Sequence, residues 1–524
     1  MKKILALTLV LCMCLAVLVA CMDNGATNEE TGTKKPAASQ SESSSDDTDP
    51  DDTDPQETEP DDTDNGNEGE QGGNESTPEA KTIEIGSVAE WEALAKDGDP
   101  DKEDFLGKTV KLTANIDFGT ETATTLFKTF AGTFDGGNFT VKGKSASRMS
   151  LLANTLDGAT VKNLTVDGFA ISPSVEGAEQ VAVIAAKAVT TAKEAKDVTL
   201  ENITVKNCSL DADKADAGNM GVGVVLGEAA NVNVKASKIT VSTCTITGTD
   251  NVSRKIGGVV GCMTTSGLST FEEIKVSMNV TARAFIGGIV GRSLGAGNLH
   301  IEKVKVTGTF DTSIACGGSE GIGGIFGAKY NEGIAAGESY VKNAYVNVKL
   351  FCSSGSGRSG GIGNWYKNQG SKANITIENC YISGEFTVKQ GDTMKDRAGG
   401  LFGEYGSHYS TLTLKNVILE AAVGQTWAGS DVTPDVTKLG KSRDSVSDSW
   451  LINYASTNTT VDGVTAPSHT IVAENCYTTI LKRSNDAALE LIAGFAFVDP
   501  SQTFEMISYD ANGFISAINA PAAS

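Results

Sequence analysis

The segment Ile286-Gly-Gly-Ile-Val-Gly291, followed by Leu299-x-Ile301-x-x-Val304-x-Val306, decides the fold of this chain. The apolar residues of the second stretch alternate, except for one extra residue between Ile301 and Val304. Alternation directs one face of a strand inward, and an inserted residue would turn every later side chain outward unless the chain bends there. The slip therefore predicts a corner between two short strands that face one core.

Both patterns recur along the chain. Relatives of the glycine-rich unit occupy residues 222–227, 256–261, 322–327, 359–364 and 398–403. The residue just before the second strand of successive repeats is Asn163, Asn202, Thr243, Glu273, Lys303, Asn343, Asn379, Asn416 and Asn475. Because asparagine tolerates left-handed backbone and bonds neighbouring backbone groups, we expect sharp corners whose amides stack as a ladder.

The repeats predict an all-β fold, a parallel β-helix of about nine coils. Each unit has two or three short strands and no recurrent hairpin turn, which argues against a propeller of four-stranded antiparallel blades. The spacing of the corner residues varies from 30 to 59, which a stacked coil tolerates because extra residues can leave as loops. A short helix beginning at Ser87, with Glu90 completing a capping box, is expected to cover the N-terminal end.

The glycine-rich units resemble the GLUG motif of bacterial surface proteins. The first segment is similar to the opening of GLUG-type β-helix proteins of gut bacteria, through Trp91-Glu-Ala-Leu-Ala95 and the stretches at residues 110–118 and 130–141. The resemblance covers about residues 83–420 and implies architecture rather than function. We assign residues 81–420 to the β-helix and residues 421–524 to an irregular last coil with a long insertion and a C-terminal cap.

Residues 1–21 have the features of a bacterial export signal. Lys2 and Lys3 precede an apolar run that ends at Leu18-Val19-Ala20-Cys21. This ending resembles the lipobox of bacterial lipoproteins, which implies a signal peptide over residues 1–20 and a diacylglycerol on Cys21. The run is short for a helix that crosses about 30 Å of hydrocarbon. We expect a chain lipid-anchored to the membrane outside the cytoplasm and exposed at the cell surface.

Residues 21–80 are predicted to be a disordered acidic linker. Residues 22–80 contain nineteen acidic and two basic residues, a net −17 of the −23 of the whole chain. They lack the apolar surface that would offset the entropy of ordering. Only about −8 remains for residues 81–524, so the low pI belongs mainly to the linker. The acidic balance argues against nucleic-acid partners.

Residues for catalysis, metal binding or cofactor binding are scarce in this sequence. The only histidines are His300, His408 and His469; none belongs to an HExxH helix, and no GxSxG elbow occurs. Neighbouring charges such as Glu302 and Lys303 fit a solvated strand face. We therefore expect no enzyme activity, metal or cofactor. A polysaccharide lyase or glycoside hydrolase on a β-helix scaffold is the alternative.

Seven cysteines follow Cys21. Cys244, Cys380 and Cys476 are assigned to a column that Leu164, Ile203, Ile274, Val304 and Val417 fill in other repeats, which predicts apolar packing. The odd number and the absence of a CxxC motif argue against a disulfide framework or a zinc site. Cys316 and Cys352 lie in Gly/Ser-rich loops, and a disulfide between them stays open.

The candidate ligand-binding residues are aromatic and follow the glycine units of three consecutive coils: Tyr330, Trp365, Tyr366, Tyr405 and Tyr409. In stacked coils, loops carrying these rings would form a strip that suits a sugar or a protein partner. The alternative is that the rings stack on each other and seal a coil edge. We expect a monomeric surface binding or adhesion protein that recognises a glycan or a host or envelope protein. A structural envelope component without a soluble ligand is a further alternative.

Overall fold

The computed structural model describes residues 82–96, 105–172, 180–215, 221–249, 252–295, 297–312, 321–332, 337–352, 358–369, 373–390, 397–405, 410–420, 422–427, 452–454, 458–461, 464–467, 469–479 and 494–521. The predicted signal peptide, Cys21 and the acidic linker lie outside these residues, as do Cys316, Tyr409 and most of the long insertion. Residues 76–524 form one compact unit.

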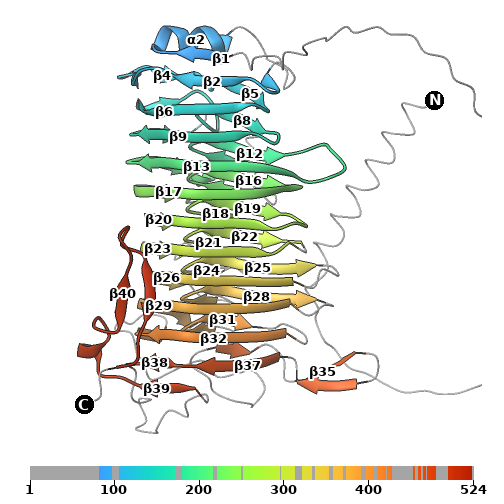
Figure 1. Ribbon diagram of the computed structural model, residues 1–524, viewed down its shortest axis with the longest axis vertical. Helices are drawn as coiled ribbons and strands as arrows, with labels where there is room; N and C mark the ends of the chain where they lie inside the picture. The colour runs from blue at the N-terminus through green and yellow to red at the C-terminus, as the bar shows by residue number, and fades with distance from the viewer. Residues whose placement is uncertain are drawn as a thin grey trace, which may run out of the picture. The chain divides into compact units, whose positions relative to one another are not determined.

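The compact unit is an all-β parallel β-helix, as the repeats predict (Figure 1). Its coils stack through a long sheet whose main strands are β1 (Thr82–Ile85), β2 (Thr109–Leu112), β6 (Thr133–Lys142), β9 (Thr160–Asp167), β13 (Lys196–Lys206), β17 (Val232–Thr247), β20 (Ser269–Thr281), β23 (Leu299–Asp311), β26 (Gly337–Cys352), β29 (Ala373–Gln390), β32 (Ser410–Leu419) and β37 (His469–Glu474). Shorter strands extend it: β3 (Ile116–Asp117), β4 (Thr122–Ala123), β7 (Ser145–Ala146), β10 (Ala170–Ile171), β14 (Ser209–Asp211), β33 (Ala422–Trp427), β38 (Cys476–Thr478) and β39 (Phe495–Phe497).

Two smaller parallel sheets complete each coil. The second sheet holds β5 (Phe127–Phe130), β8 (Ala153–Leu156), β12 (Ala185–Val189), β16 (Leu226–Ala230), β19 (Val260–Thr264), β22 (Val290–Leu294), β25 (Phe326–Glu332), β28 (Gly363–Gln369), β31 (Phe402–Tyr405) and β34 (Ile452–Tyr454). The third holds β11 (Val181–Ala182), β15 (Gly221–Gly223), β18 (Arg254–Gly257), β21 (Ala284–Gly287), β24 (Gly321–Gly323), β27 (Arg358–Gly360) and β30 (Arg397–Gly399). Within the described residues the second sheet has ten strands, one more than the nine coils expected.

The glycine-rich unit makes the turn between the third and second sheets. In the unit at residues 286–291, β21 ends at Gly287 and β22 begins at Val290. A Cβ added at Gly288 would lie 2.3 Å from the Gly324 carbonyl oxygen of the next coil. The Gly288 N–H donates to that oxygen at 3.1 Å. Glycine is therefore required here because successive backbones approach too closely for a side chain.

The predicted corner lies within the strands of the long sheet and has left-handed backbone. At Asn163, Asn202, Asn343, Asn379, Asn416 and Asn475, φ lies between +51° and +54°. Each corner lets both flanking strand segments direct their apolar residues into one core, which runs from Ile85 in the first strand to Phe495 in the last coil. The prediction of a left-handed corner is confirmed.

One member of the predicted corner column is wrong. Lys238, with φ +54°, lies between the pairs Ser237–Glu201 and Ile239–Ile203, so it occupies the position opposite Asn202. Thr243 belongs to a second left-handed bend, opposite Asn207. The assignment of Cys244 to the aliphatic column fails with it, since Ile239 fills that place. The error arose because the apolar alternation of β17 slips twice, at Lys238 and at Thr243, and the pattern alone does not show which slip is the corner.

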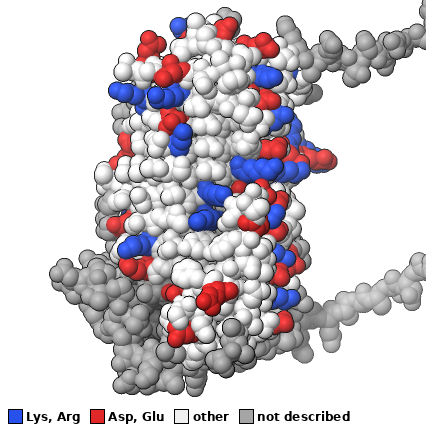
Figure 2. All heavy atoms as spheres, turned by 60° about the vertical axis from the view of Figure 1, so that its left-hand side comes forward, with Lys and Arg blue, Asp and Glu red and all other residues white. Residues whose placement is uncertain are grey.

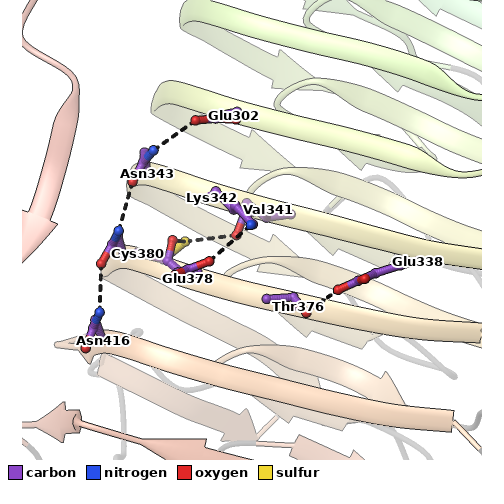
Figure 3. A network of polar contacts seen from close by, with 10 residues as sticks. Glu302, Glu338, Val341, Lys342, Asn343, Thr376, Glu378, Cys380 and Asn416 are labelled. Atoms are coloured by element: carbon purple, nitrogen blue, oxygen red, sulfur yellow. Dashed lines mark hydrogen bonds and ion pairs between the residues drawn. The ribbon is translucent and has the colours of Figure 1, made fainter.

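The corner amides form the predicted ladder in two stretches. Near the N-terminus, Asn202 Nδ2 donates to Asn163 Oδ1 at 2.9 Å. In the C-terminal half, Asn416 Nδ2 donates to Asn379 Oδ1 at 3.0 Å, and Asn379 Nδ2 donates to Asn343 Oδ1 at 3.1 Å (Figure 3). Lys238, Glu273 and Lys303 occupy the corner between the two stretches and also have left-handed backbone.

The short helix α2 (Val88–Lys96) covers the N-terminal end of the core (Figure 1). The Glu90 N–H donates to Ser87 Oγ at 3.2 Å, and the Glu90 carboxylate accepts from the Gly86 N–H at 2.7 Å. Trp91 is buried, and its indole N–H donates to the Thr124 carbonyl at 2.8 Å. The helix therefore begins where the capping box predicted. The Glu90 carboxylate accepts from the N–H of Gly86, the residue before Ser87.

The C-terminal hairpin turns back along the flank of the long sheet. Strands β40 (Ile507–Tyr509) and β41 (Ile515–Ile518) pair antiparallel, and β41 contacts β26, β29 and β32 (Figure 1). Their apolar side chains cover outward-facing residues of the long sheet in a second hydrophobic cluster, which includes Tyr381, Ile418 and Tyr477. A further antiparallel pair joins β35 (Asn458–Val461) to β36 (Val464–Pro467).

Replacing Asn379 by alanine is expected to lower the free energy of unfolding by about 2–3 kcal/mol. The variant loses two amide hydrogen bonds, about 1 kcal/mol each, and places an alanine in left-handed backbone. Asn379→Gly removes the ladder but suits the backbone, so it should lose less. Urea unfolding of the three proteins measures both differences. An alanine variant as stable as the parent protein would contradict a role for the ladder.

Candidate functional site on the outer face of the long sheet

The predicted aromatic strip lies on neighbouring strands of the second sheet, rather than in loops. Strands β25, β28 and β31 are adjacent, and Tyr366 pairs directly with Tyr405. Tyr330 and Trp365 are offset from them by one position, since Tyr330 pairs with Lys367 and Trp365 with Glu404. The structure thus brings four of the five residues onto neighbouring coils but divides them between register columns. Tyr409 lies outside the described residues.

The tyrosine column continues through a residue that the sequence did not single out. Tyr454 of β34 pairs with Tyr405, next to the Tyr366–Tyr405 pair. On the other side, Tyr366 pairs with Lys329 of β25, which is buried. Desolvation lowers the pKa of the Lys329 amine to about 7, and the amine donates to the Gly297 carbonyl at 2.6 Å. Tyr454 belongs to the long insertion, where no repeat pattern marks its register.

Charged side chains form a column on the outward face of the long sheet, just before the corner. Stacked strands lie about 4.8 Å apart, so each residue lies beside its counterparts in the coils above and below. From the first coil to the last the column contains Glu84, Lys111, Asp135, Lys162, Glu201, Ser237, Glu272, Glu302, Lys342, Glu378, Lys415 and Glu474. Opposite charges alternate at both ends, which avoids the repulsion of like charges on adjacent strands.

The alternation fails in the middle of the column, where Glu272 and Glu302 are neighbours. Lys303, at the corner, compensates by approaching Glu272 at 3.1 Å and Glu273 at 3.7 Å. The hydrogen bond to Glu272 is the main reason that the pKa of Lys303 is raised, against the opposing effect of burial. Asn343 donates to Glu302 at 3.2 Å (Figure 3). Polar side chains at the corner therefore stabilise this stretch of the charged column.

An aromatic pair lies beside this charged stretch, one position further out along the strands. His300 of β23 and Tyr340 of β26 pair across the sheet, and their rings stack with centroids 4.1 Å apart. The Lys342 ammonium lies 4.9 Å from the Tyr340 ring centroid and 3.2 Å from the Glu378 carboxylate. Burial, and next the Glu302 carboxylate, raise the pKa of Tyr340. We call His300, Tyr340 and Lys342, with Glu338 and Thr376, the β23–β29 patch.

Acceptors and donors surround the rings of the β23–β29 patch. Thr376 Oγ1 donates to a Glu338 carboxylate oxygen at 2.7 Å (Figure 3). A ring nitrogen of His300 lies 3.2 Å from the Glu338 carbonyl oxygen. The rings and Lys342 are partly exposed, and Glu338 is exposed. The patch therefore offers a pair of stacked, partly exposed rings with a cation and a carboxylate beside them.

Sequence reasoning missed this patch although both rings lie at outward positions of alternating strands. His300 follows the buried Leu299, and Tyr340 precedes the buried Val341. They are forty residues apart in sequence, and the length of a coil varies, so only the register shows that they are neighbours. The sequence could have shown that each ring points outward, because each ring follows or precedes a buried residue of its strand. It could not have shown which rings stack on each other.

Thiol chemistry is suppressed at three of the buried cysteines. Burial raises the pKa of Cys380 to about 12 and the pKa of Cys476 to about 11. Cys380 pairs with Val417, so the prediction that these two residues replace aliphatic ones in the core is confirmed. Burial also raises the pKa of Cys262 to about 11. These thiols stay neutral at physiological pH and are poor nucleophiles.

Figure 2 shows acidic and basic side chains scattered over one side of the molecule, with no large area of one sign. In the described part of the chain, no three or more His, Cys, Asp or Glu side chains are grouped to hold a metal ion. No helix in the same residues is long and apolar enough to span a membrane.

Comparison of the chain with protein-family models, curated proteins and solved structures gave no match. The resemblance to the GLUG motif therefore rests on the glycine-rich units and the first segment alone.

Asp135 in the charged column predicts a pH-dependent contribution to stability. Burial raises its pKa, but hydrogen bonds from the Gly137 N–H and the Asn163 amide, with Lys162 and Lys111 on the neighbouring strands, outweigh burial and lower the pKa. Because the folded pKa lies below the unfolded value of about 3.9, the stabilisation is present above that pH. It is lost as the pH falls through the folded pKa.

Asp135→Asn should therefore lose less stability than the parent protein on acidification from about pH 5 to about pH 2. The urea midpoint of both proteins, measured across this interval, tests the difference. Parallel pH profiles would contradict a lowered pKa of Asp135, since the other carboxylates titrate in both proteins.

Proposed function

We propose that this chain is a lipid-anchored binding or adhesion protein of the bacterial cell surface, whose β-helix recognises a glycan or a host or envelope protein. The observation that carries the proposal is the β23–β29 patch. Stacked aromatic rings that are partly exposed among polar groups suit contact with a sugar or with an aromatic-rich protein surface. Lys342 and Glu338 at the edge supply a donor and an acceptor for hydroxyl groups.

The rigidity of the coil supports this function. The patch residues come from three strands that pair in register over most of their length, so no loop has to be ordered on binding. Preorganised side chains lose little conformational entropy when a ligand binds. The predicted anchor at Cys21 and the acidic linker would hold such a surface away from the membrane.

Tyr340→Ala is expected to reduce binding at least tenfold, because it removes the exposed ring and the stack with His300. The probe is an array of glycans and of host and envelope proteins, followed by titration of each positive ligand. Phe504→Ala removes an exposed ring from the C-terminal segment and serves as the matched control. Unchanged unfolding midpoints would show that both variants fold. Equal binding by the Tyr340 variant and the parent protein would overturn the role of the patch.

A separate variant tests the strip predicted from the sequence. The triple replacement of Trp365, Tyr366 and Tyr405 by alanine is expected to abolish binding if the second sheet, rather than the long sheet, contacts the ligand. Loss of binding in this variant alone would transfer the site to β28 and β31. An array without any positive ligand would favour a structural envelope component, and cleavage of a polysaccharide would favour the enzyme alternative.

Cys21→Ser tests the anchor. The variant has no thiol to receive diacylglycerol, so it is expected to leave the detergent phase in a phase-partitioning experiment, whereas the parent protein stays in it. Mass spectrometry of the N-terminal peptide is the accompanying measurement. A parent protein without an acyl group on Cys21 would contradict the lipoprotein assignment.

A further inference from the structure

Cys208 and Cys244 lie opposite each other on adjacent coils. Lys206 pairs with Ser242 on one side of them, and Ser209 pairs with Thr245 on the other. The Thr245 N–H donates to the carbonyl oxygen of Cys208 at 3.0 Å. The intervening Asn207 and Thr243 have the same left-handed backbone, each with φ +55°, so the two strands bend together and keep the cysteines in step.

Both side chains are buried in the core, and both are free thiols in the structure. Cys208 and Cys244 are each 1% exposed; Cys208 Sγ donates to the Lys206 carbonyl at 3.3 Å, and Cys244 Sγ donates to the Ser242 carbonyl at 3.5 Å. Adjacent strands are about 4.8 Å apart, which lies inside the range of about 4.4–6.8 Å that Cα atoms of a disulfide span. The Cα separation of the pair therefore meets the requirement of a cross-link.

The other buried cysteines lack this arrangement. Cys380 pairs with Val417, and Cys262 pairs with Glu228 and Arg292. Cys352 pairs with Val388. Among the described strands, only Cys208 and Cys244 face each other across a single step of the coil.

We propose that Cys208 and Cys244 are oxidised to a disulfide that links two adjacent coils. The oxidant is a small-molecule or protein disulfide. One cysteine thiolate attacks it and releases a thiol, and the second cysteine then displaces the remaining thiol from the mixed disulfide. The two cysteine thiols become one disulfide, and the oxidant is reduced to two thiols. Because the folded pair is buried, the exchange takes place during folding, before the coils close over it.

The cross-link would join two coils at the point where the first stretch of the corner ladder ends. The loop that it closes is one coil long, and Lys238 replaces asparagine at the corner between the two cysteines. A disulfide that closes such a loop restricts the unfolded chain and so favours the folded state. Oxidation in the cell requires the export that the proposed function assumes. Oxidation during refolding in vitro does not require it.

The test begins with the full chain refolded in a buffer of oxidised and reduced glutathione. Remaining thiols are then alkylated in denaturant, and the digest is mapped by mass spectrometry without reduction. A peptide linked through Cys208 and Cys244 is expected. Alkylation of both cysteines in the refolded protein would overturn the proposal.

Variants supply an independent readout. Adding dithiothreitol should lower the Tm of the parent protein by several degrees and leave the Tm of the Cys208→Ala/Cys244→Ala variant unchanged. The matched control, Cys380→Ala/Cys476→Ala, should keep the sensitivity to dithiothreitol. An unchanged sensitivity in the Cys208/Cys244 variant would overturn the proposal.

Protein isolated from the cell envelope separates this inference from the proposed function. The linked peptide in envelope protein supports both. Free thiols in envelope protein, together with the linked peptide after refolding, would contradict export to an oxidising compartment and leave the cross-link intact as a property of the fold.

Discussion

The left-handed corner of the long sheet is the constraint on which the rest of this structure depends. A strand that continued straight would turn half of its apolar residues to solvent, because side chains alternate along it. The corner resets the alternation, so both flanking segments bury their apolar faces in one core. Left-handed backbone costs about 1–2 kcal/mol for most residues. Asparagine reduces this cost through its local hydrogen bonds, and stacking of the coils lets each amide bond the next.

Stacking also determines the character of the outer surface. Each position on a coil recurs about 4.8 Å away in its neighbours, so the surface consists of columns rather than isolated residues. Like charges in a column repel, and the alternation from Glu84 to Lys162 answers this constraint. Where alternation fails, at Glu272 and Glu302, the corner column supplies Lys303 and Asn343 as partners. The His300–Tyr340 stack lies beside these two glutamates. Polar contacts with the neighbouring strands hold the polar groups around the stack in place.

The sequence predicted the parts of the fold that repeat within one coil. The apolar alternation, the slip and the glycine-rich unit each have a local cause, and the capping box at Ser87 begins the helix at the expected residue. Prediction failed where two coils had to be aligned. Thr243 looked like a corner residue, and it is one, but of a second bend; Lys238 faces Asn202. Both bends interrupt the apolar alternation of β17 in the same way, so the pattern misplaced both Thr243 and Cys244.

The sequence by itself determined that the chain forms a β-helix, because backbone sterics and the period of strands act over a few residues. Only the tertiary structure decided which residues of different coils are neighbours, since that depends on loop lengths that vary between coils. The β23–β29 patch, the split of the aromatic strip between three columns and the hairpin on the flank of the long sheet all follow from this register. So does the position of Cys208 opposite Cys244, since the sequence had assigned Cys244 to a different core column and had given Cys208 no position.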